Sequence, residues 1–397
     1  MKATPEDVGL SGSRLYKIDH LTRRYIDEGK LPGTITMVAR RGKVVHLSCQ
    51  GKMDVEADKD MEEDTIFRIY SMSKPITSTA LMMLYEDGQF QLDCPVSYYI
   101  PGFKNLKVHT SNGLIDPDRE MTIRDLLTHT SGLTYGFPIA TSPVDAMYRE
   151  RQVTQSKDLG EMVEKLCDIP LLFSPGTRWN YSVSTDVCGY LVQKISDTPF
   201  DEFLSEQIFE PLEMEDTGFT VPEDKVHRLA ANYQHTDDDG MQLVDPPETS
   251  IYLKKRMLSG GGGLVSTVSD YNRFAQMLAG KGEHDGTRIL GRKTVELMTS
   301  NHMPDNVDLS AMGQAVFSET PYDGIGFGLG FSVMLDPPTA GILGTPGEFA
   351  WGGAASTYFF VDPVEDLVVI LLTQLMPSST YPIRRELRVL AYQSIID

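Results

Sequence analysis

The strand-like segments of this chain lie at its two ends, with mainly helical segments between them. Residues 33–39 and 43–49 are rich in β-branched and apolar residues and are joined by Arg40, Arg41 and Gly42, which predicts a hairpin. Strand-like runs return at residues 326–334, 357–361 and 366–373. These runs predict an α+β fold in which one antiparallel sheet, flanked by helices, is built from both ends of the chain and a mainly helical domain is inserted.

Helical patterns account for most of the remaining chain. Apolar residues recur at helical spacing in residues 7–29, 75–87, 183–196 and 383–395. A length of 397 residues suggests two or three structural units of about 150 residues each. We therefore expect a discontinuous α/β sheet domain formed by residues 1–70 and 245–397, and a mainly helical domain formed by residues 71–244.

The chain is strongly acidic, with 36 basic and 56 acidic residues and a formal net charge of −20. Such a surface repels phosphate backbones and anionic lipids, so we expect neither nucleic acid nor a membrane surface as a partner. Residues 236–240 (TDDDG) indicate an acidic, solvated turn. No apolar run reaches the roughly 18 residues of a spanning helix, and the longest candidate, residues 367–372, has the length of a strand.

The cysteines and the N-terminus indicate in which cellular compartment the protein is expected. The first 12 residues contain no basic stretch followed by an apolar one, so they do not resemble a signal peptide. Cys49, Cys94, Cys167 and Cys188 are too few and too scattered for a disulfide scaffold. No HxH or HExxH pair is present, which argues against a zinc site. We expect a cytoplasmic protein that uses no metal and no cofactor.

One serine arrangement suits nucleophilic catalysis. Ser71 and Lys74 lie three residues apart, where the strand-like residues 65–70 give way to a predicted helix. Residues i and i+3 share one helix face, so the Lys74 amine can lie beside the Ser71 hydroxyl. The helix N-terminus adds positive potential there, and an unprotonated lysine would accept the serine proton. The same pattern also fits a serine that caps the helix and a lysine in solvent.

Six segments in order along the chain resemble the serine β-lactamase and penicillin-binding protein superfamily. They are FRIYSMSK (67–74), GQFQLDCPV (88–96), TIRDLLTHTSGL (122–133), SPGTRWNYS (174–182), PLEMEDTGF (211–219) and GGGGLVSTVSD (260–270). The four glycines of the last segment predict unusual backbone angles or close packing. More narrowly, the chain resembles the family VIII carboxylesterases, which share the class C β-lactamase fold. The resemblance implies a β-lactamase-like fold and a serine hydrolase.

The resemblance also implies roles for particular residues. The family's nucleophile falls on Ser71, its lysine on Lys74 and its catalytic tyrosine on Tyr181. The backbone N–H groups of Ser71 and Ala354 are implied to form the oxyanion hole. The Lys74–Tyr181 couple would accept the serine proton if the pKa of each group fell toward neutrality. For Tyr181 the alternative is a core aromatic residue whose hydroxyl is satisfied.

The chain departs from the β-lactamase pattern in two places. The segment Tyr181-Ser182-Val183 lacks the asparagine of the Tyr-x-Asn element, and Trp351-Gly352-Gly353 replaces Lys-Thr-Gly. Both departures resemble family VIII esterases, and both remove groups that recognise β-lactams and carboxylates. Trp351 offers an apolar wall to a neutral ester, or else packs in the core. The glycine pair allows the backbone to approach a ligand closely.

Three residues of the loop after the third segment are further candidates. His129 suggests a serine–histidine pair, but the family pattern gives that histidine no catalytic role, so we expect a structural one. Tyr135 and Phe137 are expected to line an acyl or alcohol pocket, although loop aromatics often only pack.

These expectations describe a serine carboxylesterase that hydrolyses neutral, short-chain esters through an acyl-enzyme at Ser71. Its expected partner is a small-molecule ester, with weak binding of β-lactams besides. The acidic surface and the missing lysine at Trp351 both predict a site that disfavours anionic substrates. The alternatives are a β-lactamase, a D-Ala-D-Ala peptidase or an acyltransferase of the same superfamily, and a non-enzymatic ligand-binding homologue.

Overall fold

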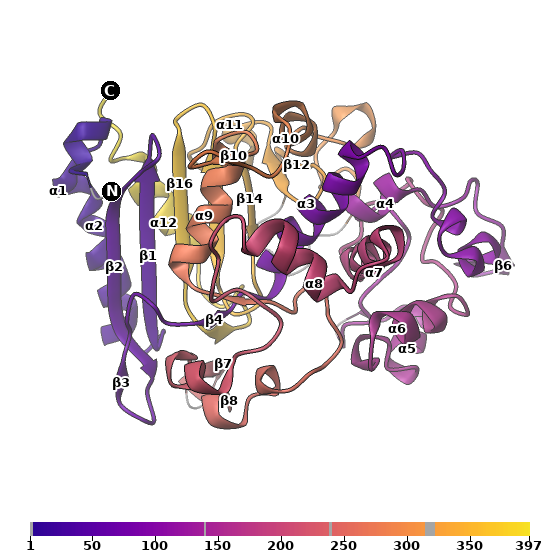
Figure 1. The fold of residues 1–397 in the computed structure, drawn as a ribbon, viewed down its shortest axis with the longest axis horizontal. Coiled ribbons are helices and arrows are strands. Elements are labelled where there is room, and N and C mark those ends of the chain that lie inside the picture. Colours follow the sequence, from indigo (N-terminus) through magenta and orange to yellow (C-terminus); the bar gives the residue numbers. More distant parts are fainter. Residues whose placement is uncertain (1–2, 139, 238–239, 314–321) are drawn as a thin grey trace.

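The largest element of the fold is an eight-stranded antiparallel sheet (Figure 1). The computed structural model describes residues 3–138, 140–237, 240–313 and 322–397. In spatial order the strands are β12 (Ile325–Phe327), β13 (Ser332–Met334), β14 (Phe349–Gly352), β15 (Tyr358–Asp362), β16 (Leu367–Leu372), β1 (Gly33–Arg40), β2 (Lys43–Asp54) and β3 (Lys59–Asp60). The N-terminal β1 pairs with the C-terminal β16, with Ile35 opposite Leu372. The predicted sheet from both chain ends is therefore confirmed.

Both faces of the sheet are buried, which explains the continuous apolar run of β16. Successive side chains of a strand point to opposite faces. Val369 and Leu371 belong to one apolar cluster, and Ile370 and Leu372 belong to another. The first face is covered by α1 (Gly12–Leu15), α2 (Lys17–Asp27) and α12 (Ile383–Tyr392), and the second by α9 (Val268–Ala279) (Figure 1).

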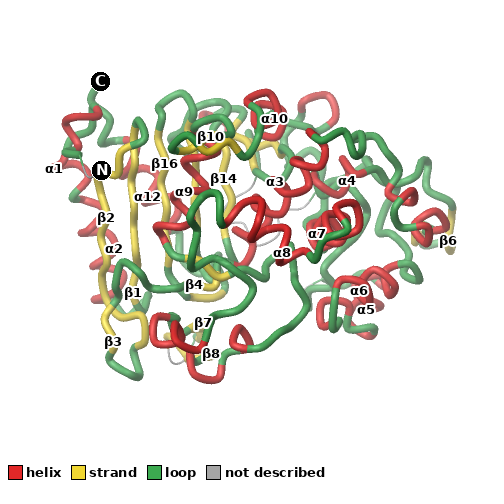
Figure 2. Tube along the Cα trace, in the orientation of Figure 1, coloured by secondary structure: helices red, strands yellow, loops and turns green. Residues whose placement is uncertain are grey.

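The middle of the chain carries most of the other helices, on one side of the sheet (Figure 2). They are α3 (Ser73–Glu86), α4 (Ile123–Leu127), α5 (Pro143–Glu150), α6 (Leu159–Leu166), α7 (Ser184–Ser196) and α8 (Phe200–Leu204). Two short helices, α10 (Arg292–Met298) and α11 (Pro337–Ala340), follow α9. Within the described ranges, no helix combines the length and the apolar character needed to cross a membrane.

A small three-stranded sheet of β17 (Leu375–Met376), β7 (Asn232–Thr236) and β8 (Gly240–Asp245) was not predicted. The turn predicted at residues 236–240 lies partly outside the described residues, at 238–239. The remaining strand pairs are short: β4 (Phe67–Arg68) with β9 (Val265–Ser266), β5 (Val108–Thr110) with β6 (Gly113–Ile115), and β10 (Glu283–His284) with β11 (Thr287–Arg288). The pair of β4 and β9 matters most here, because β4 leads directly to Ser71.

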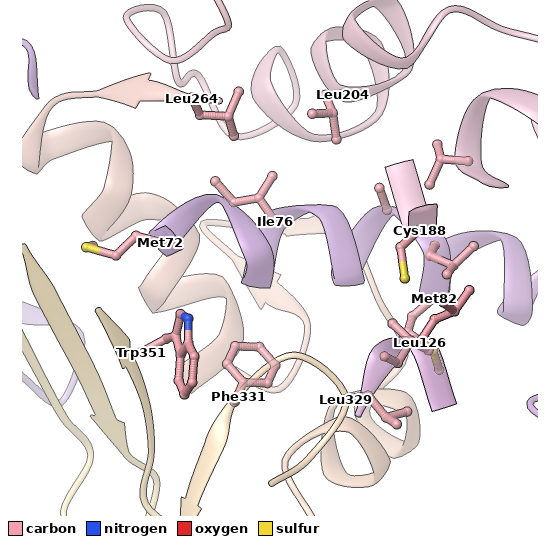
Figure 3. Close-up of a cluster of buried hydrophobic side chains, with 14 of the residues drawn as sticks. Met72, Ile76, Met82, Leu126, Cys188, Leu204, Leu264, Leu329, Phe331 and Trp351 are labelled. Atoms are coloured by element: carbon pink, nitrogen blue, oxygen red, sulfur yellow. The ribbon is translucent and has the colours of Figure 1, made fainter. Parts of the chain in front are cut away.

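Helix α3 is buried on all sides and forms the centre of the core. Ile76 points toward Leu204 and Leu264, whereas Phe331 and Trp351 lie on the opposite side of the helix (Figure 3). A helix without an exposed polar face is typical of a core element, and the polar residues of α3, such as Thr77 and Ser78, are buried as well. The helix that follows Ser71 is therefore packed firmly between the sheet and the surrounding helices.

Three predicted elements differ from the structure, and backbone conformation explains each difference. The helix predicted at residues 7–29 is interrupted, because Gly9 ends a first 3-10 turn with a φ of 75°. The strand predicted at 326–334 is a hairpin of β12 and β13 that turns through Gly330, at a φ of 101°. The strand predicted at 65–70 is limited to β4, since Tyr70 adopts a φ of 44°.

Candidate active site

Ser71 lies in a 3-10 turn that joins β4 to α3. The turn is held from both sides, because the N–H of Ile69 donates to the Leu264 carbonyl and the N–H of Leu264 donates to the Ser73 hydroxyl. Tyr70, directly before Ser71, has a left-handed φ of 44°, which is costly for a residue with a side chain. The serine is therefore presented by a strained backbone that its neighbours hold in place.

Lys74 lies one helical turn after Ser71 and is almost completely buried, with 1% of its surface exposed. Its Nζ lies 3.3 Å from the Ser71 Oγ and 2.6 Å from the carbonyl oxygen of Gly261. Burial lowers the pKa of Lys74 from 10.5 to about 7, against the opposing charge of Asp186. The alternative of a solvated lysine is therefore wrong, and the first turn of α3 has no side-chain cap from Ser71.

Tyr181 lies in the loop before α7, and this loop is tied to the segment around His129. The N–H of Asn180 donates to the His129 carbonyl, and the Asn180 side chain donates to the Leu133 carbonyl. The N–H of Val183 donates to the Thr134 carbonyl. Hydrogen bonds to residues 129–134 therefore hold the loop that carries Tyr181 in position.

The Tyr181 ring is enclosed by other aromatic rings. The ring centroids of His129, Tyr135 and Trp351 lie 5.0, 5.3 and 5.5 Å from its own. Burial raises the pKa of Tyr181 above its usual value of 10, and its interactions with the side chains of Ser71 and Trp351 offset only part of this. The condition that the pKa of each member of the couple falls toward neutrality is therefore met by Lys74 and is not met by Tyr181, because a phenolate is poorly solvated in an aromatic shell.

His129 is buried within this shell. Its Nδ1 lies 3.2 Å from the Ser182 hydroxyl, and its ring packs against Tyr181, Trp179 and Phe327. Burial, aided by the nearby Lys74, lowers its pKa well below 6.5, so the imidazole stays neutral at physiological pH. His129 is not among the residues that line the cavity at Ser71, in agreement with a structural role.

The end of β14 brings residues 351–354 close to Ser71. A β-carbon on Gly353 would lie 2.4 Å from the Ile69 carbonyl oxygen, and one on Gly352 would lie 2.8 Å from the Arg384 guanidinium carbon. Gly353 is therefore required by neighbouring backbone atoms, whereas a side chain at Gly352 would require the Arg384 side chain to move. This close approach brings the exposed Ala354 onto the same cavity as Ser71.

A cavity of about 370 Å³ opens at Ser71. Many of its lining residues are apolar or aromatic: Phe137, Tyr181, Ile325, Met334, Ile342, Ala350, Trp351 and Met376. Of the two loop aromatics, Phe137 lines the cavity, while Tyr135 stacks on Phe137 and packs against Tyr181. Trp351 was expected either to form an apolar wall of the site or to pack in the core. It does both, since it lines the cavity and is only 8% exposed.

The cavity is also lined by Arg384, Arg385 and Arg388, which sequence reasoning did not anticipate. The expectation of a site that disfavours anionic substrates considered only the missing lysine, because the sequence did not reveal that the first turn of α12 lines the cavity. All three guanidinium groups bind protein atoms, and Arg385 donates to the Gly341 carbonyl. Arg388 is buried against Glu348, with a distance of 2.5 Å, and Arg384 donates to the carbonyls of Gly353 and Thr357.

Sequence reasoning also missed the polar groups on the far side of Lys74. The Asp186 carboxylate accepts hydrogen bonds from the Ser259 hydroxyl and from the N–H of Gly261. The run of four glycines was predicted to pack closely, and it does so here: a β-carbon on Gly261 would lie 2.6 Å from Asp186 Oδ2. No local pattern marks Asp186, because its hydrogen bond joins residues 75 positions apart.

Comparison with known proteins agrees with this fold. A family model described as Beta-lactamase matches residues 18–393. The protein Rv1367c of Mycobacterium tuberculosis is 36% identical over 89% of this chain and 88% of its own length. Esterase EstB of Burkholderia gladioli is 30% identical over 90% and 89%. The solved structure of EstCE1, described as a hydrolase with promiscuous acyltransferase activity, superposes with a TM-score of 0.80 at 26% identity, covering 96% of this chain and 99% of its own.

The fold and these relatives define a serine hydrolase with a β-lactamase-like fold. The chain belongs to the beta-lactamase family. Its similarity to EstB and EstCE1 confirms the predicted resemblance to the family VIII carboxylesterases.

Proposed function

We propose that the protein is a carboxylesterase that forms an acyl-enzyme on Ser71. The observation that carries this proposal is the position of the Lys74 amine, buried, 3.3 Å from the Ser71 hydroxyl, at the mouth of a largely apolar cavity. With a pKa of about 7, a substantial fraction of Lys74 is unprotonated at neutral pH. An uncharged amine at this distance is suited to accept the serine proton.

In the first step, Ser71 Oγ attacks the ester carbonyl carbon while its proton passes to Lys74. The developing oxyanion would be bound by the backbone N–H groups of Ser71 and Ala354, both on residues that line the cavity. Collapse of the tetrahedral intermediate breaks the bond to the alcohol oxygen, which leaves with a proton.

Tyr181 is suited to deliver that proton. The raised pKa of Tyr181 keeps the phenol protonated, so Tyr181 serves as a donor and relay rather than as the base. The side chains of Tyr181 and Ser71 interact, and the Lys74 Nζ lies over the Tyr181 ring, 4.4 Å from its centroid. Both groups are therefore near the reacting oxygen, and the proton gained by the lysine replaces the one that the phenol gives to the leaving group. Water then attacks the acyl-enzyme by the reverse sequence of proton transfers and releases the acid.

The cavity supports a neutral ester as the substrate class. Trp351 and Phe137 form apolar walls beside Ser71. Arg388 is neutralised by Glu348, and Arg384 binds two backbone carbonyls. A volume of about 370 Å³ suits a small-molecule ester with a short acyl chain.

The test is hydrolysis of p-nitrophenyl butyrate by the wild-type protein and by Ser71→Ala, beside hydrolysis of nitrocefin. We expect clear ester hydrolysis, a loss of at least about 10³-fold in the variant, and slow nitrocefin turnover. Ser78→Ala is the control, because Ser78 lies on the same helix, is not among the residues that line the cavity, and its hydroxyl has no hydrogen-bond partner within the described residues. Wild-type rates in folded Ser71→Ala would overturn the proposal, and faster nitrocefin turnover would favour a β-lactamase.

Acyl transfer is a second candidate, favoured by the likeness to EstCE1, which is described as having promiscuous acyltransferase activity. The same acyl-enzyme would serve both reactions, and the acceptor decides between them. Adding a primary alcohol to the assay and measuring the new ester against the free acid separates the two.

A further inference from the structure

Asp186, on α7, is a buried carboxylate that the proposed chemistry does not use directly. Only 2% of its surface is exposed. Its hydrogen-bond donors are neutral: the Ser259 hydroxyl and the N–H of Gly261. The cation that acts on it is Lys74. A buried carboxylate without a direct ion pair is costly, so its presence calls for a functional explanation.

Gly261 connects this carboxylate to the lysine. The N–H of Gly261 donates to Asp186 Oδ1 over 3.1 Å, and its carbonyl oxygen accepts from Lys74 Nζ over 2.6 Å. One residue thus contacts the carboxylate with its donor and the amine with its acceptor. Rotation of the Gly261 backbone is opposed by Asp186, so the carbonyl that binds Lys74 stays in place.

The other titratable groups around Lys74 remain uncharged in the neutral range. Burial raises the pKa of Tyr135 and Tyr181 above 10, and it lowers the pKa of His129 well below 6.5. Cys188, on the same helix as Asp186, stays a thiol because burial raises its pKa as well. Burial raises the pKa of Asp186 above 3.8, and Asp186 is the buried carboxyl group whose negative charge acts on the Lys74 amine.

We propose that Asp186 is a positioning residue that holds the Gly261 carbonyl against Lys74 and whose negative charge sets the pH at which Lys74 gives up its proton. This inference rests on the proposed function, in which Lys74 acts as the general base. It goes beyond that function because it assigns the working pH of the base to a residue that touches neither the substrate nor Ser71.

The test is the pH dependence of kcat/KM for Asp186→Asn, an isosteric substitution that removes the charge. A negative charge favours the ammonium form of Lys74, so its removal lowers the pKa of the lysine. We expect the acid limb of the profile to move to lower pH by about one unit. We also expect kcat on the plateau to fall by up to about tenfold, because an amide holds Gly261 less firmly. Hydrolysis of p-nitrophenyl butyrate is followed between about pH 5 and pH 9.

Asp270→Asn is the matched control. Asp270 is also a buried carboxylate that accepts from a hydroxyl, that of Thr217, and from a backbone N–H, that of Asp216, but it lies on α9. Its substitution should lower the midpoint of thermal unfolding and leave the acid limb in place. A second neutral variant, Asp186→Ser, should move the limb in the same direction as Asp186→Asn.

The outcomes separate this inference from the proposed function. If folded Asp186→Asn keeps both the wild-type limb and the wild-type plateau, Asp186 is only structural and the inference is wrong. The same holds if neither neutral variant folds while Asp270→Asn does. In both cases the proposed function stands as long as Ser71→Ala is inactive. An active Ser71→Ala variant overturns the proposed function itself.

Discussion

The side-chain nitrogen of Lys74 lies 2.6 Å from the carbonyl oxygen of Gly261. A neutral amine that donates one N–H to this carbonyl keeps its lone pair for the hydroxyl of Ser71, 3.3 Å away. An ammonium group would donate to both oxygens and could not accept a proton. The backbone of the glycine run thus orients the amine, and the burial that surrounds it favours the form with the lone pair.

Replacement of Lys74 by methionine should nearly abolish ester hydrolysis. The variant keeps an unbranched apolar side chain of similar length but has no group to accept the Ser71 proton. General-base contributions are typically about 10²–10⁴-fold, so we expect a fall of this size in kcat/KM. The measurement is steady-state hydrolysis of p-nitrophenyl butyrate at neutral pH. Activity within about threefold of wild type would assign the base to another group.

The same Lys74→Met substitution should stabilise the fold at neutral pH. The pKa of Lys74 is 10.5 in an unfolded chain and about 7 in the folded protein. Between these values the unfolded chain binds more protons, so the contribution of Lys74 to the free energy of unfolding rises with pH across this window. Folding with the amine deprotonated therefore costs a few kcal/mol at pH 7 and nothing above about pH 10.5.

Urea unfolding of both proteins at neutral pH and near pH 9.5 measures this effect. We expect Lys74→Met to be the more stable protein at neutral pH, by a difference that shrinks toward the alkaline value. A stability difference that is the same at both pH values would contradict the lowered pKa of the lysine.

Replacement of Tyr181 by phenylalanine should affect esters according to their leaving group. If the phenol supplies a proton to the departing alcohol, ethyl esters lose more than p-nitrophenyl esters, because nitrophenolate leaves without a proton. We expect at least about a tenfold difference between the two losses in kcat. Tyr190→Phe is the control, since Tyr190 is a partly buried residue of α7 outside the cavity lining. Equal losses for both esters would place Tyr181 in another step.

Local patterns predicted part of this site. The spacing of Ser71 and Lys74 on one helix turn predicted their contact, because it depends only on helix geometry. The sequence did not show which side chains of β16 point to which face of the sheet. Both faces are buried, so the strand is a continuous apolar run. Tyr181 was found through family resemblance, because nothing in its local sequence distinguishes it from a core tyrosine.

The remaining part of the site depends on contacts between distant segments. Asp186 and Gly261 are 75 positions apart, and their hydrogen bond follows from the packing of α7 beside the glycine run. The arginines of α12 enter the cavity from the opposite face of the sheet, which no local pattern reveals. The requirement for glycine at Gly353 comes from the Ile69 carbonyl rather than from a ligand.

The two tryptophans of the chain should separate substrate selection from stability. Both rings pack near Tyr181, but only Trp351 lines the cavity. Trp351→Phe should change the ratio of kcat/KM values between p-nitrophenyl acetate and p-nitrophenyl hexanoate by about threefold or more, because the smaller ring leaves more room in the cavity beside Ser71. Trp179→Phe should lower the unfolding midpoint and leave that ratio unchanged. An equal change in both variants would mean that the ratio reports the placement of Tyr181.

Substitution of Gly261 by alanine should disable the base without touching Ser71 or the substrate. The new β-carbon would lie 2.6 Å from Oδ2 of the buried Asp186 and 2.8 Å from the hydroxyl oxygen of the partly buried Tyr135. Relief of this clash moves the Gly261 carbonyl away from Lys74. We expect kcat to fall by about 10²-fold with a much smaller change in KM, because substrate contacts are preserved.

The neighbouring glycine provides the control for this substitution. A β-carbon on Gly262 would meet the Tyr70 backbone at 3.7 Å, an ordinary contact distance, so Gly262→Ala should keep most of the activity. Steady-state kinetics of the two variants, with circular dichroism to verify folding, compares one added methyl group at two adjacent positions of the same loop. If both alanine variants lose activity equally, the glycine run is needed for loop flexibility in general. If only Gly261→Ala does, the position of its carbonyl beside Lys74 is what the reaction requires.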